Sequence, residues 1–271
     1  AGVALVSIVG WVVVNGVSHL SWEFVFGDYS VLDHTNYTIG PSIVATLMTI
    51  ALSIGISVPI GVATAVYLHE YSKRGSKIVK TIRTCIDILS SVPSIVYALF
   101  GAITFKLWFG GTLSILAGSL TITLMLLPIV VRSTEESLKT VPDSLREGSF
   151  ALGAGKVRTI FKIVLPGALP GIMSAIILAM GRVVSESAPF LYTMGSSIQP
   201  MPTGYQSGGT TLAVALYRFA GEGRYMNEAY ATAVVLIVIV LGLNLLAEAI
   251  GRGLNKKLQG ETNAVRKKRK R

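Results

Sequence analysis

Charged residues are scarce in this chain of 271 residues. Asp, Glu, Lys and Arg together make up 14% of it, against about a quarter in ordinary soluble domains. Apolar residues make up 51%, and the mean hydropathy is +0.62. This shortage of charge excludes a disordered chain, a coiled coil and most soluble enzymes. The same length can hold about six membrane-spanning helices of roughly 20 residues each, together with their loops.

Groups that carry enzyme chemistry are also scarce. Cys85 is the only cysteine, so no disulfide can form within the chain. The three histidines, His19, His34 and His69, are scattered without metal-ligand spacing. The sequence contains neither the GxxxxGKS/T phosphate-binding loop nor the GxSxG nucleophile motif. We therefore expect no metal site, no catalytic residue and no bound cofactor in this chain.

Long uncharged apolar runs are what the sequence does contain, and such runs predict transmembrane helices. We place six spans at residues 1–19, 41–68, 86–107, 111–132, 167–195 and 229–250. Buried core helices of a large soluble protein are the alternative, but six of them would leave too little polar surface to cover them. The predicted fold is an all-α integral membrane protein. No charged segment precedes the first run, which favours a first helix cut short over a secretory signal peptide.

Lys and Arg are unevenly distributed between the loops. They gather at 69–85, at 132–166 and after the sixth span, whereas the opposite loops hold only Lys106, Arg218 and Arg224. By the positive-inside rule the first three regions are cytoplasmic. We therefore expect a multi-pass protein of the cell membrane with both termini in the cytoplasm.

The basic balance of the chain does not require a nucleic-acid partner. The loop bias and the basic tail, 251–271, account for the net charge of +10. The tail either touches anionic membrane lipid or has no role.

The cytoplasmic segment Val141–Gly171 has the pattern of a helix-turn-helix. Ser144 and Glu147 have the spacing of a capping box, which predicts a helix start near 142–144. The segment Gly153-Ala154-Gly155 breaks this helix, and a second helix starts at Lys156 and ends at Leu165–Pro166. A short amphipathic helix at this place either lies in the membrane interface or docks into a groove of a soluble partner.

Part of this segment resembles a known loop motif. Glu147-Gly148-Ser149 is followed after three residues by Gly153, and after nine more by Ile163-Val164-Leu165-Pro166. This resembles the EAA loop of binding-protein-dependent ABC importers, EAA-x3-G-x9-I-x-L-P. Gly148 and Ser149 replace the two alanines, and both are small. The resemblance implies that the loop, about 141–166, is the coupling helix, which docks into a groove on the ATP-hydrolysing subunit.

The order of segments over nearly the whole chain is similar to that of phosphate-specific transport permeases of the PstA type. The segments are YLHEYS (67–72), IRTCIDILSSVPSIVYALFG (82–101), LPIVVRSTEESLKTVPDSLREGSFALGAG (127–155), GRVVSESAPFLYTMG (181–195) and TLAVALYRFA (211–220). The resemblance implies one ABC transmembrane domain over 1–271, with the type I importer (MetI-like) fold and a core at 41–250. It also implies that the chain is the phosphate permease subunit.

The same resemblance implies partners. They are an ATP-binding subunit of the PstB type, which holds ATP and Mg²⁺, a second permease of the PstC type, and an extracytoplasmic phosphate-binding protein of the PstS type.

Two charged residues fall inside the predicted fifth span. Arg182 lies about 24 Å along the helix from Pro166, at about 1.5 Å per residue, and Glu186 follows four residues later on the same face. Either the pair only locks helix packing, or it lines the substrate route, as intramembrane ions usually do. The guanidinium fork matches two phosphate oxygens, and Ser185 is a further hydroxyl donor. The resemblance implicates Arg182 and also Arg132 in phosphate passage.

Two charged residues lie closer to the ends of predicted spans and have simpler interpretations. On its own, Arg132 at the end of the fourth span is typical of a snorkelling residue. Asp87, near the cytoplasmic end of the third span, is expected to pair with Arg83, four residues earlier.

Two alternative functions stay open. One is the permease of an importer for another solute, such as sulfate, molybdate or a polyamine, although a cationic solute would fit Arg182 badly. The other is an ion-driven secondary transporter, for which inverted repeats are expected. The sequence shows no convincing repeat, and a docking loop would then be unexplained.

Overall fold

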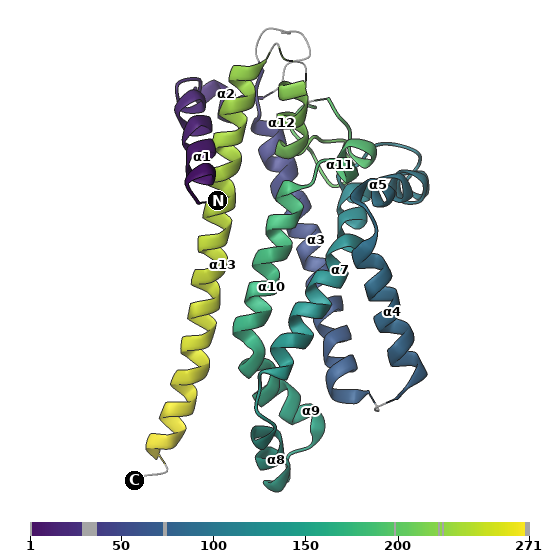
Figure 1. The fold of residues 1–271 in the computed structure, drawn as a ribbon, viewed down its shortest axis with the longest axis vertical. Helices are drawn as coiled ribbons and strands as arrows, with labels where there is room; N and C mark the ends of the chain where they lie inside the picture. Colours follow the sequence, from purple (N-terminus) through teal and green to yellow (C-terminus); the bar gives the residue numbers. More distant parts are fainter. Residues whose placement is uncertain are drawn as a thin grey trace. The chain divides into compact units, whose positions relative to one another are not determined.

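The computed structural model describes residues 2–28, 37–72, 75–197, 199–221, 223 and 225–268, with side chains up to residue 253. Every regular element in these ranges is a helix, which confirms the all-α class (Figure 1). The elements are α1 (Gly2–Val17), α2 (Trp22–Phe26), α3 (Gly40–Val66), η1 (Tyr67–Tyr71), α4 (Lys77–Ser91), α5 (Ser94–Ile103), α6 (Phe105–Trp108), α7 (Ile115–Lys139), α8 (Asp143–Ala151), α9 (Lys156–Thr159), η2 (Ile160–Val164), α10 (Leu165–Ser185), α11 (Ala188–Thr193), α12 (Leu212–Gly221) and α13 (Met226–Lys268). The two η elements are single π-helical turns.

Four helical segments of the described chain are long and apolar enough to cross a membrane: Gly40–Tyr71, Ile115–Lys139, Lys156–Ser185 and Met226–Gly253. The broken pair Lys77–Ser91 and Ser94–Trp108 meets the same criterion when it is taken as one span. Helix α1 is apolar but has 16 residues, fewer than the roughly 20 that a bilayer requires. The described residues therefore give four or five spans, and the predicted count of six is not confirmed.

The predicted third span, 86–107, is two helices rather than one. α4 begins nearer the N-terminus, at Lys77, and ends at Ser91, and Pro93 is the N-cap of α5. A proline lacks the N–H that a helix interior needs and disfavours helical backbone at the residue before it. Apolar residues continue across the break, so hydropathy alone does not reveal it.

The predicted fifth span, 167–195, is wrong at both ends. The helix made of α9, η2 and α10 passes Pro166 without ending and stops at Ser185. In the π-helical turn η2, the N–H of Leu165 donates to the carbonyl of Ile160, five residues earlier. Local π-helical turns are one of the ways in which membrane helices accommodate an internal proline.

The chain forms two compact units, each described by itself. The first comprises residues 1–56, 91–125 and 180–242, and the second comprises residues 57–90, 126–179 and 243–271.

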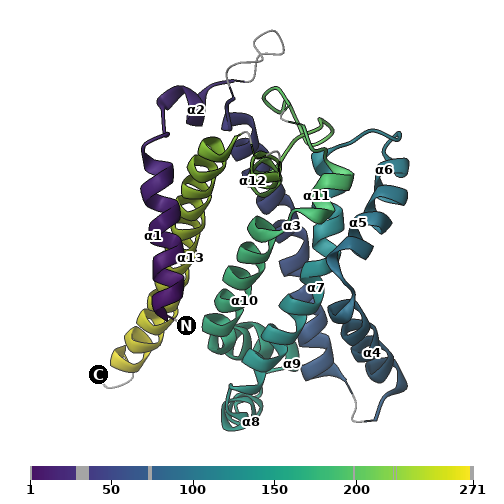
Figure 2. The same cartoon turned by 45° about the horizontal axis from the view of Figure 1, so that its top comes forward.

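In the first unit, α1 packs along α13 (Figure 2). A Cβ at Gly16 would lie 2.4 Å from the carbonyl oxygen of Tyr230, so the close approach of the two helices requires glycine. The apolar core of this unit is formed by Phe24, Ile39, Leu212, Ala215, Phe219, Ala229 and Ala231.

The loop between α11 and α12 is bound to the start of α7. The Ile115 N–H donates to the Ser207 carbonyl (3.0 Å), and the Leu116 N–H donates to the Tyr205 carbonyl (2.7 Å). These bonds satisfy N–H groups of a first helical turn, which have no partner within the helix. The loop is therefore an ordered part of this unit.

In the second unit, η1 and parts of α3, α4, α7, η2 and α10 share an apolar core. Its members are Ala65, Leu68, Ile86, Val131, Leu138, Val141, Val164, Ala168 and Ile172. A Cβ at Gly171 would lie 2.0 Å from Ser137 Oγ, so α7 and α10 approach closely there. Two members of this core, Val141 and Val164, flank the segment that contains α8 and α9.

Candidate functional site

The turn after α8 is built around Gly153. Its φ of +82° lies in the left-handed region that glycine adopts without strain. The Gly153 N–H donates to the Phe150 carbonyl (2.9 Å), and the Ala154 N–H donates to the Ser149 carbonyl (3.1 Å). These two bonds define a Schellman motif, which satisfies the last carbonyls of a helix. The predicted break after α8 and the restart at Lys156 are confirmed.

The predicted start of α8 near 142–144 is confirmed, but its cap differs from the prediction. The helix begins at Asp143, but Pro142 is its N-cap and makes no side-chain cap bond. Ser144 is already the second residue of the helix, past the position from which an N-cap hydroxyl reaches the free N–H groups. The predicted capping box is therefore wrong. Asp143 instead places a negative charge in the first turn, where the helix dipole favours it.

Most of the apolar side chains of α8 and α9 face outward. Only Arg146 and Ser149 of α8 are buried. Leu152, which follows α8, is 87% exposed. The α8–α9 apolar set comprises the exposed residues Leu145, Phe150, Leu152 and Val157. Exposed apolar side chains gathered over a short helix are typical of a surface that is covered in an assembly.

The first three motif residues have different surroundings. Glu147 is exposed. Gly148 is also exposed, and a Cβ there would meet nothing within 4 Å. Ser149 is buried, and its hydroxyl lies 2.8 Å from Thr159 Oγ1 of α9. Close packing therefore explains the small residue at 149 but not the one at 148, where glycine costs about 1 kcal/mol of helix stability relative to alanine.

The last two motif residues lie at the start of α10. Leu165 lines an apolar groove of about 680 Å³ together with Ile160, Phe161 and residues of α3 and η1. Pro166 follows it inside the helix. The motif is thus divided between the α8 turn and the helix that continues into α10.

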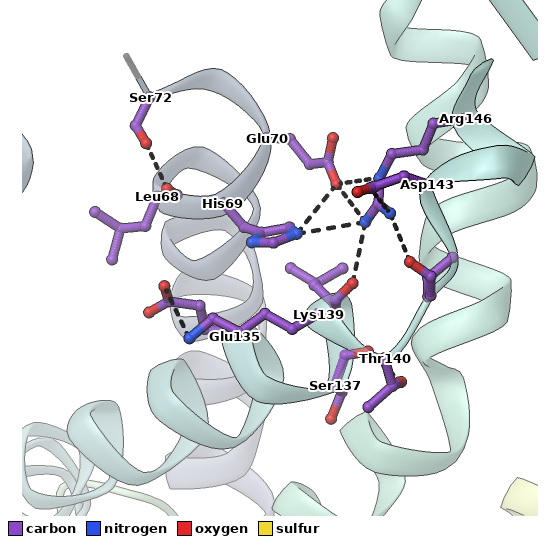
Figure 3. Close-up of polar contacts among 12 residues, drawn as sticks. Leu68, His69, Glu70, Ser72, Glu135, Ser137, Lys139, Thr140, Asp143 and Arg146 are labelled. Carbon is purple, nitrogen blue, oxygen red and sulfur yellow. Dashed lines mark hydrogen bonds and ion pairs between the residues drawn. The ribbon is translucent and has the colours of Figure 1, made fainter. Parts of the chain in front are cut away.

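Sequence reasoning counted Arg146 only as a loop charge, but the structure buries it, with 11% of its side chain exposed (Figure 3). The guanidinium donates twice to Glu70 Oε1 of η1, at 3.1 and 3.0 Å. It also donates to the carbonyls of Leu138 (3.0 Å) and Val141 (2.7 Å). The only signal in the sequence is the three-residue spacing of Arg146 from Ser149, which puts both on one face of a helix.

Arg182 and Glu186 form the predicted ion pair, with 2.8 Å between the guanidinium nitrogen and Oε1. Arg182 lies in the last turn of α10, and Glu186 follows the end of that helix. The Glu186 side chain is 11% exposed and that of Arg182 is 47% exposed. The arginine therefore retains N–H donors that this contact does not use.

Ser185 does not aim its hydroxyl at an open site. Its Oγ donates to the Arg182 carbonyl at 3.2 Å. This bond satisfies one of the carbonyls that remain free at the end of α10.

A second charged cluster joins α4 to α7. Arg132 pairs with Asp87, and Arg83 lies 2.5 Å from Glu135, which is also 3.7 Å from Lys139. The predicted pair of Arg83 with Asp87 is therefore wrong, because both side chains reach partners on α7 instead. All five line a cavity of about 210 Å³. Arg132 belongs to a charged cluster and is not a lone boundary residue.

The predicted site residues fall into both units. Arg182, Ser185 and Glu186 belong to the first unit, whereas Arg132 and the whole coupling segment belong to the second. Among the described residues, no group of three or more His, Cys, Asp or Glu side chains could hold a metal ion.

The fold is the one found in chains of solved ABC transporters. A chain of the MetNI methionine ABC transporter matches it with a TM-score of 0.64 at 22% identity, over 78% of this chain and 93% of that one. A chain of a bacterial alginate ABC transporter also matches with a TM-score of 0.64, at 14% identity, over 93% and 90% of the two chains. At these identities the likeness shows the fold alone.

Sequence comparison gives the family. Residues 57–260 match the family "Binding-protein-dependent transport system inner membrane component", and the chain belongs to it. The "Probable ABC transporter permease protein YqgI" of Bacillus subtilis is 33% identical over 94% of this chain and 91% of its own length. The "Phosphate transport system permease protein PstA 1" of Mycobacterium tuberculosis is 39% identical over 76% of this chain and 67% of its own. The PstA protein of Mycobacterium leprae is 40% identical over 71% and 64%.

Proposed function

We propose that this chain is a permease subunit of an ATP-driven importer that carries inorganic phosphate across the cell membrane. Relatives at 38–40% identity are named phosphate transport system permeases. The observation that carries the proposal is Arg182, which is half exposed and has a buried carboxylate as its only counter-ion among the described contacts. A guanidinium presents a planar fork that fits two oxygens of an oxyanion.

Glu186 gives this arginine a resting state. Without an anion, the carboxylate offsets the cost of holding a guanidinium in a site of low dielectric. When phosphate arrives, it competes with Glu186 for the N–H donors of Arg182. The nearby negative charge also repels the bound anion, which keeps its residence short and lets it pass.

The segment α8–α9 is the coupling element of this proposal. The α8–α9 apolar set is exposed in the chain alone and suits insertion into a groove of a partner subunit. That partner is an ATPase of the PstB type, and it binds ATP and Mg²⁺. Closure of the ATPase dimer displaces α8 and turns the spans from an inward-facing to an outward-facing state.

The remaining partners and the orientation complete the proposal. A second permease of the PstC type forms the other half of the pathway, and an extracytoplasmic binding protein of the PstS type delivers phosphate. Both termini lie in the cytoplasm, because the positive-inside rule puts the Lys- and Arg-rich loops on that side.

Reconstitution of the four-component complex into lipid vesicles tests the function. The binding protein and either labelled phosphate or labelled sulfate are added outside, and ATP is enclosed. We expect ATP-dependent uptake of phosphate and none of sulfate. Uptake of sulfate in its place would assign the permease to another oxyanion. Uptake driven by an ion gradient without ATP would contradict the importer class.

A further inference from the structure

Helix α8 is held by two buried side chains, and both are polar. They are Arg146 and Ser149, while the apolar residues of α8 are exposed. Ser149 contacts Thr159 of α9, whose helix continues into α10. Arg146 reaches the other way, towards η1 at the end of span Gly40–Tyr71. The coupling helix is therefore linked to two different spans through two separate polar contacts.

A single guanidinium joins three segments of the second unit (Figure 3). Arg146 lies on α8, Glu70 lies on η1, and the Leu138 carbonyl belongs to the last turn of α7. The last four carbonyls of a helix have no partner within it, so the arginine also completes the end of α7. Nε2 of His69 lies 3.4 Å from the same guanidinium.

The surroundings of this pair keep it intact. The side chains of Arg146 and Glu70 are 11% and 9% exposed, so water and salt screen their attraction little. Leu68, which precedes His69 and Glu70 on η1, is in the core with Leu138 and Val141. Both η1, through Leu68, and the turn before α8, through Val141, are thus anchored in the same apolar core.

We propose that the Arg146–Glu70 pair makes α8 and the end of span Gly40–Tyr71 move as one body. Arg146 is then a positioning residue: when the coupling helix α8 is displaced, the ion pair transmits that displacement to α3. This inference rests on the proposed coupling role of α8. Without the pair, α8 stays attached to α9 through Ser149 and to the end of α7 through the bond of Arg146 to the Leu138 carbonyl. Its movement then reaches α10 and α7 but no longer reaches α3 directly.

Distance measurement tests the link directly. Spin labels are placed at Ser144→Cys on α8 and Ile60→Cys on α3, both exposed positions, after Cys85→Ser removes the native thiol. The complete complex is measured in vesicles with and without ATP. We expect one narrow distance distribution that ATP leaves unchanged. With Glu70→Gln, which keeps the size of the side chain and removes its charge, the distribution broadens and changes on ATP binding.

Transport coupling gives the second measurement. Changes along a coupling path alter the coupling by about 2- to 30-fold, so we expect phosphate uptake per ATP hydrolysed to fall by such a factor in Glu70→Gln. The ATPase subunit should still co-purify, and hydrolysis should continue. Asp143→Asn is the matched control, because Asp143 touches the same guanidinium at 2.9 Å but lies on α8 itself and is 87% exposed. Uptake per ATP should be unchanged in this control.

Two results would overturn the inference. One is an unaltered distance distribution together with unaltered uptake per ATP in Glu70→Gln. The other is an equal loss in Asp143→Asn, which would indicate a general effect of charge near Arg146. If Glu70→Gln does not assemble, Arg146→Lys, which keeps the charge and loses the fork, is subjected to the same two measurements. If the unaltered complex takes up no phosphate, the proposed function fails, while the width of the distance distribution still tests the link.

Discussion

At the scale of single residues, two arginines of this chain are held in opposite ways. Arg146 has its donors occupied by Glu70, Asp143 and backbone carbonyls, and it is buried. Arg182 has one carboxylate and is 47% exposed. An arginine whose donors are all used can hold a structure together but cannot bind a solute. Only the second arrangement leaves a guanidinium able to exchange partners.

The first prediction concerns Arg182. Arg182→Gln removes the fork and keeps most of the volume, so we expect the complex to assemble and phosphate uptake to fall. Hydrogen bonds to a charged group contribute about 1.5–3 kcal/mol, which corresponds to a loss of roughly 10- to 150-fold. Initial rates of labelled phosphate uptake measure this loss.

The matched control for this change lies in α13. Arg252 pairs with Glu248 at the same four-residue spacing, at 2.6 Å, and is 81% exposed. Arg252→Gln should leave uptake unchanged. The double variant Arg182→Gln with Glu186→Gln should stay inactive. If that double variant recovers full uptake, the pair has a packing role only.

The sequence predicted the Arg182–Glu186 pair because the two residues are four apart within the predicted fifth span. It predicted Arg83 with Asp87 by the same spacing, and there the structure pairs each with α7. Spacing along a helix identifies which residues can meet, but partners from other helices compete for the same charges. Arg146 was missed for this reason, since its partner Glu70 is distant in sequence and only the fold brings the two together.

At the scale of elements, the coupling segment depends on the shape of one turn. The left-handed φ of Gly153 allows the Schellman bonds that end α8. An L-residue other than Asn or Asp pays about 1–2 kcal/mol there. The neighbouring motif glycine, Gly148, lies in ordinary helix with open space around it. The two glycines therefore predict opposite responses to the same substitution.

The second prediction follows from this contrast. Gly153→Ala should lower the stability of the segment by about 1–2 kcal/mol and weaken co-purification of the ATPase, whereas Gly153→Asn should be milder. Gly148→Ala should be neutral or stabilise by up to about 1 kcal/mol. Thermal unfolding of the purified complex and pull-down of the ATPase subunit measure both effects. Equal sensitivity at the two positions would contradict the role of the turn.

The third prediction concerns the α8–α9 apolar set. Leu152 is 87% exposed, so Leu152→Asp should leave the folded chain intact. If this surface enters an ATPase groove, the change should weaken that contact by about 2 kcal/mol or more, as at a binding hot spot. Titration of the ATPase subunit against the reconstituted permease measures the shift. Ile78→Asp, at a 63% exposed position in the region 69–85 that is expected to be cytoplasmic, is the comparison, and its ATPase affinity should not change.

Hydropathy predicted most of these elements and misplaced their ends. The predicted spans 41–68 and 229–250 fall within the helical segments Gly40–Tyr71 and Met226–Gly253, because both segments stay helical throughout. The same measure fails at Pro93 and after Ser185, where apolar residues continue although the helix does not. A window average registers composition, whereas a helix ends where single backbone groups lose their partners.

At the scale of the whole molecule, charge asymmetry predicts the orientation in the membrane. The loop that contains Ser76 should face the cytoplasm, and the loop that contains Thr112 should face outward. In a Cys85→Ser background, Ser76→Cys should resist a membrane-impermeant thiol reagent in intact cells and react after permeabilisation. Thr112→Cys should react in both conditions. The reverse pattern would invert the topology.

The π-helical turn η2 changes the angle about the helix axis at which α10 follows α9. One residue turns an α-helix by about 100°, and a single π turn inserts about one residue into an α-helix. Helix α10 is therefore rotated about the helix axis by about 100° relative to α9, compared with an uninterrupted α-helix. Deleting one residue within Ile160–Val164 would restore regular α-helical pitch. The span would remain helical, yet α8 would point in another direction relative to α10. We therefore expect this deletion to give a chain with a more regular helix in which ATP hydrolysis no longer drives transport.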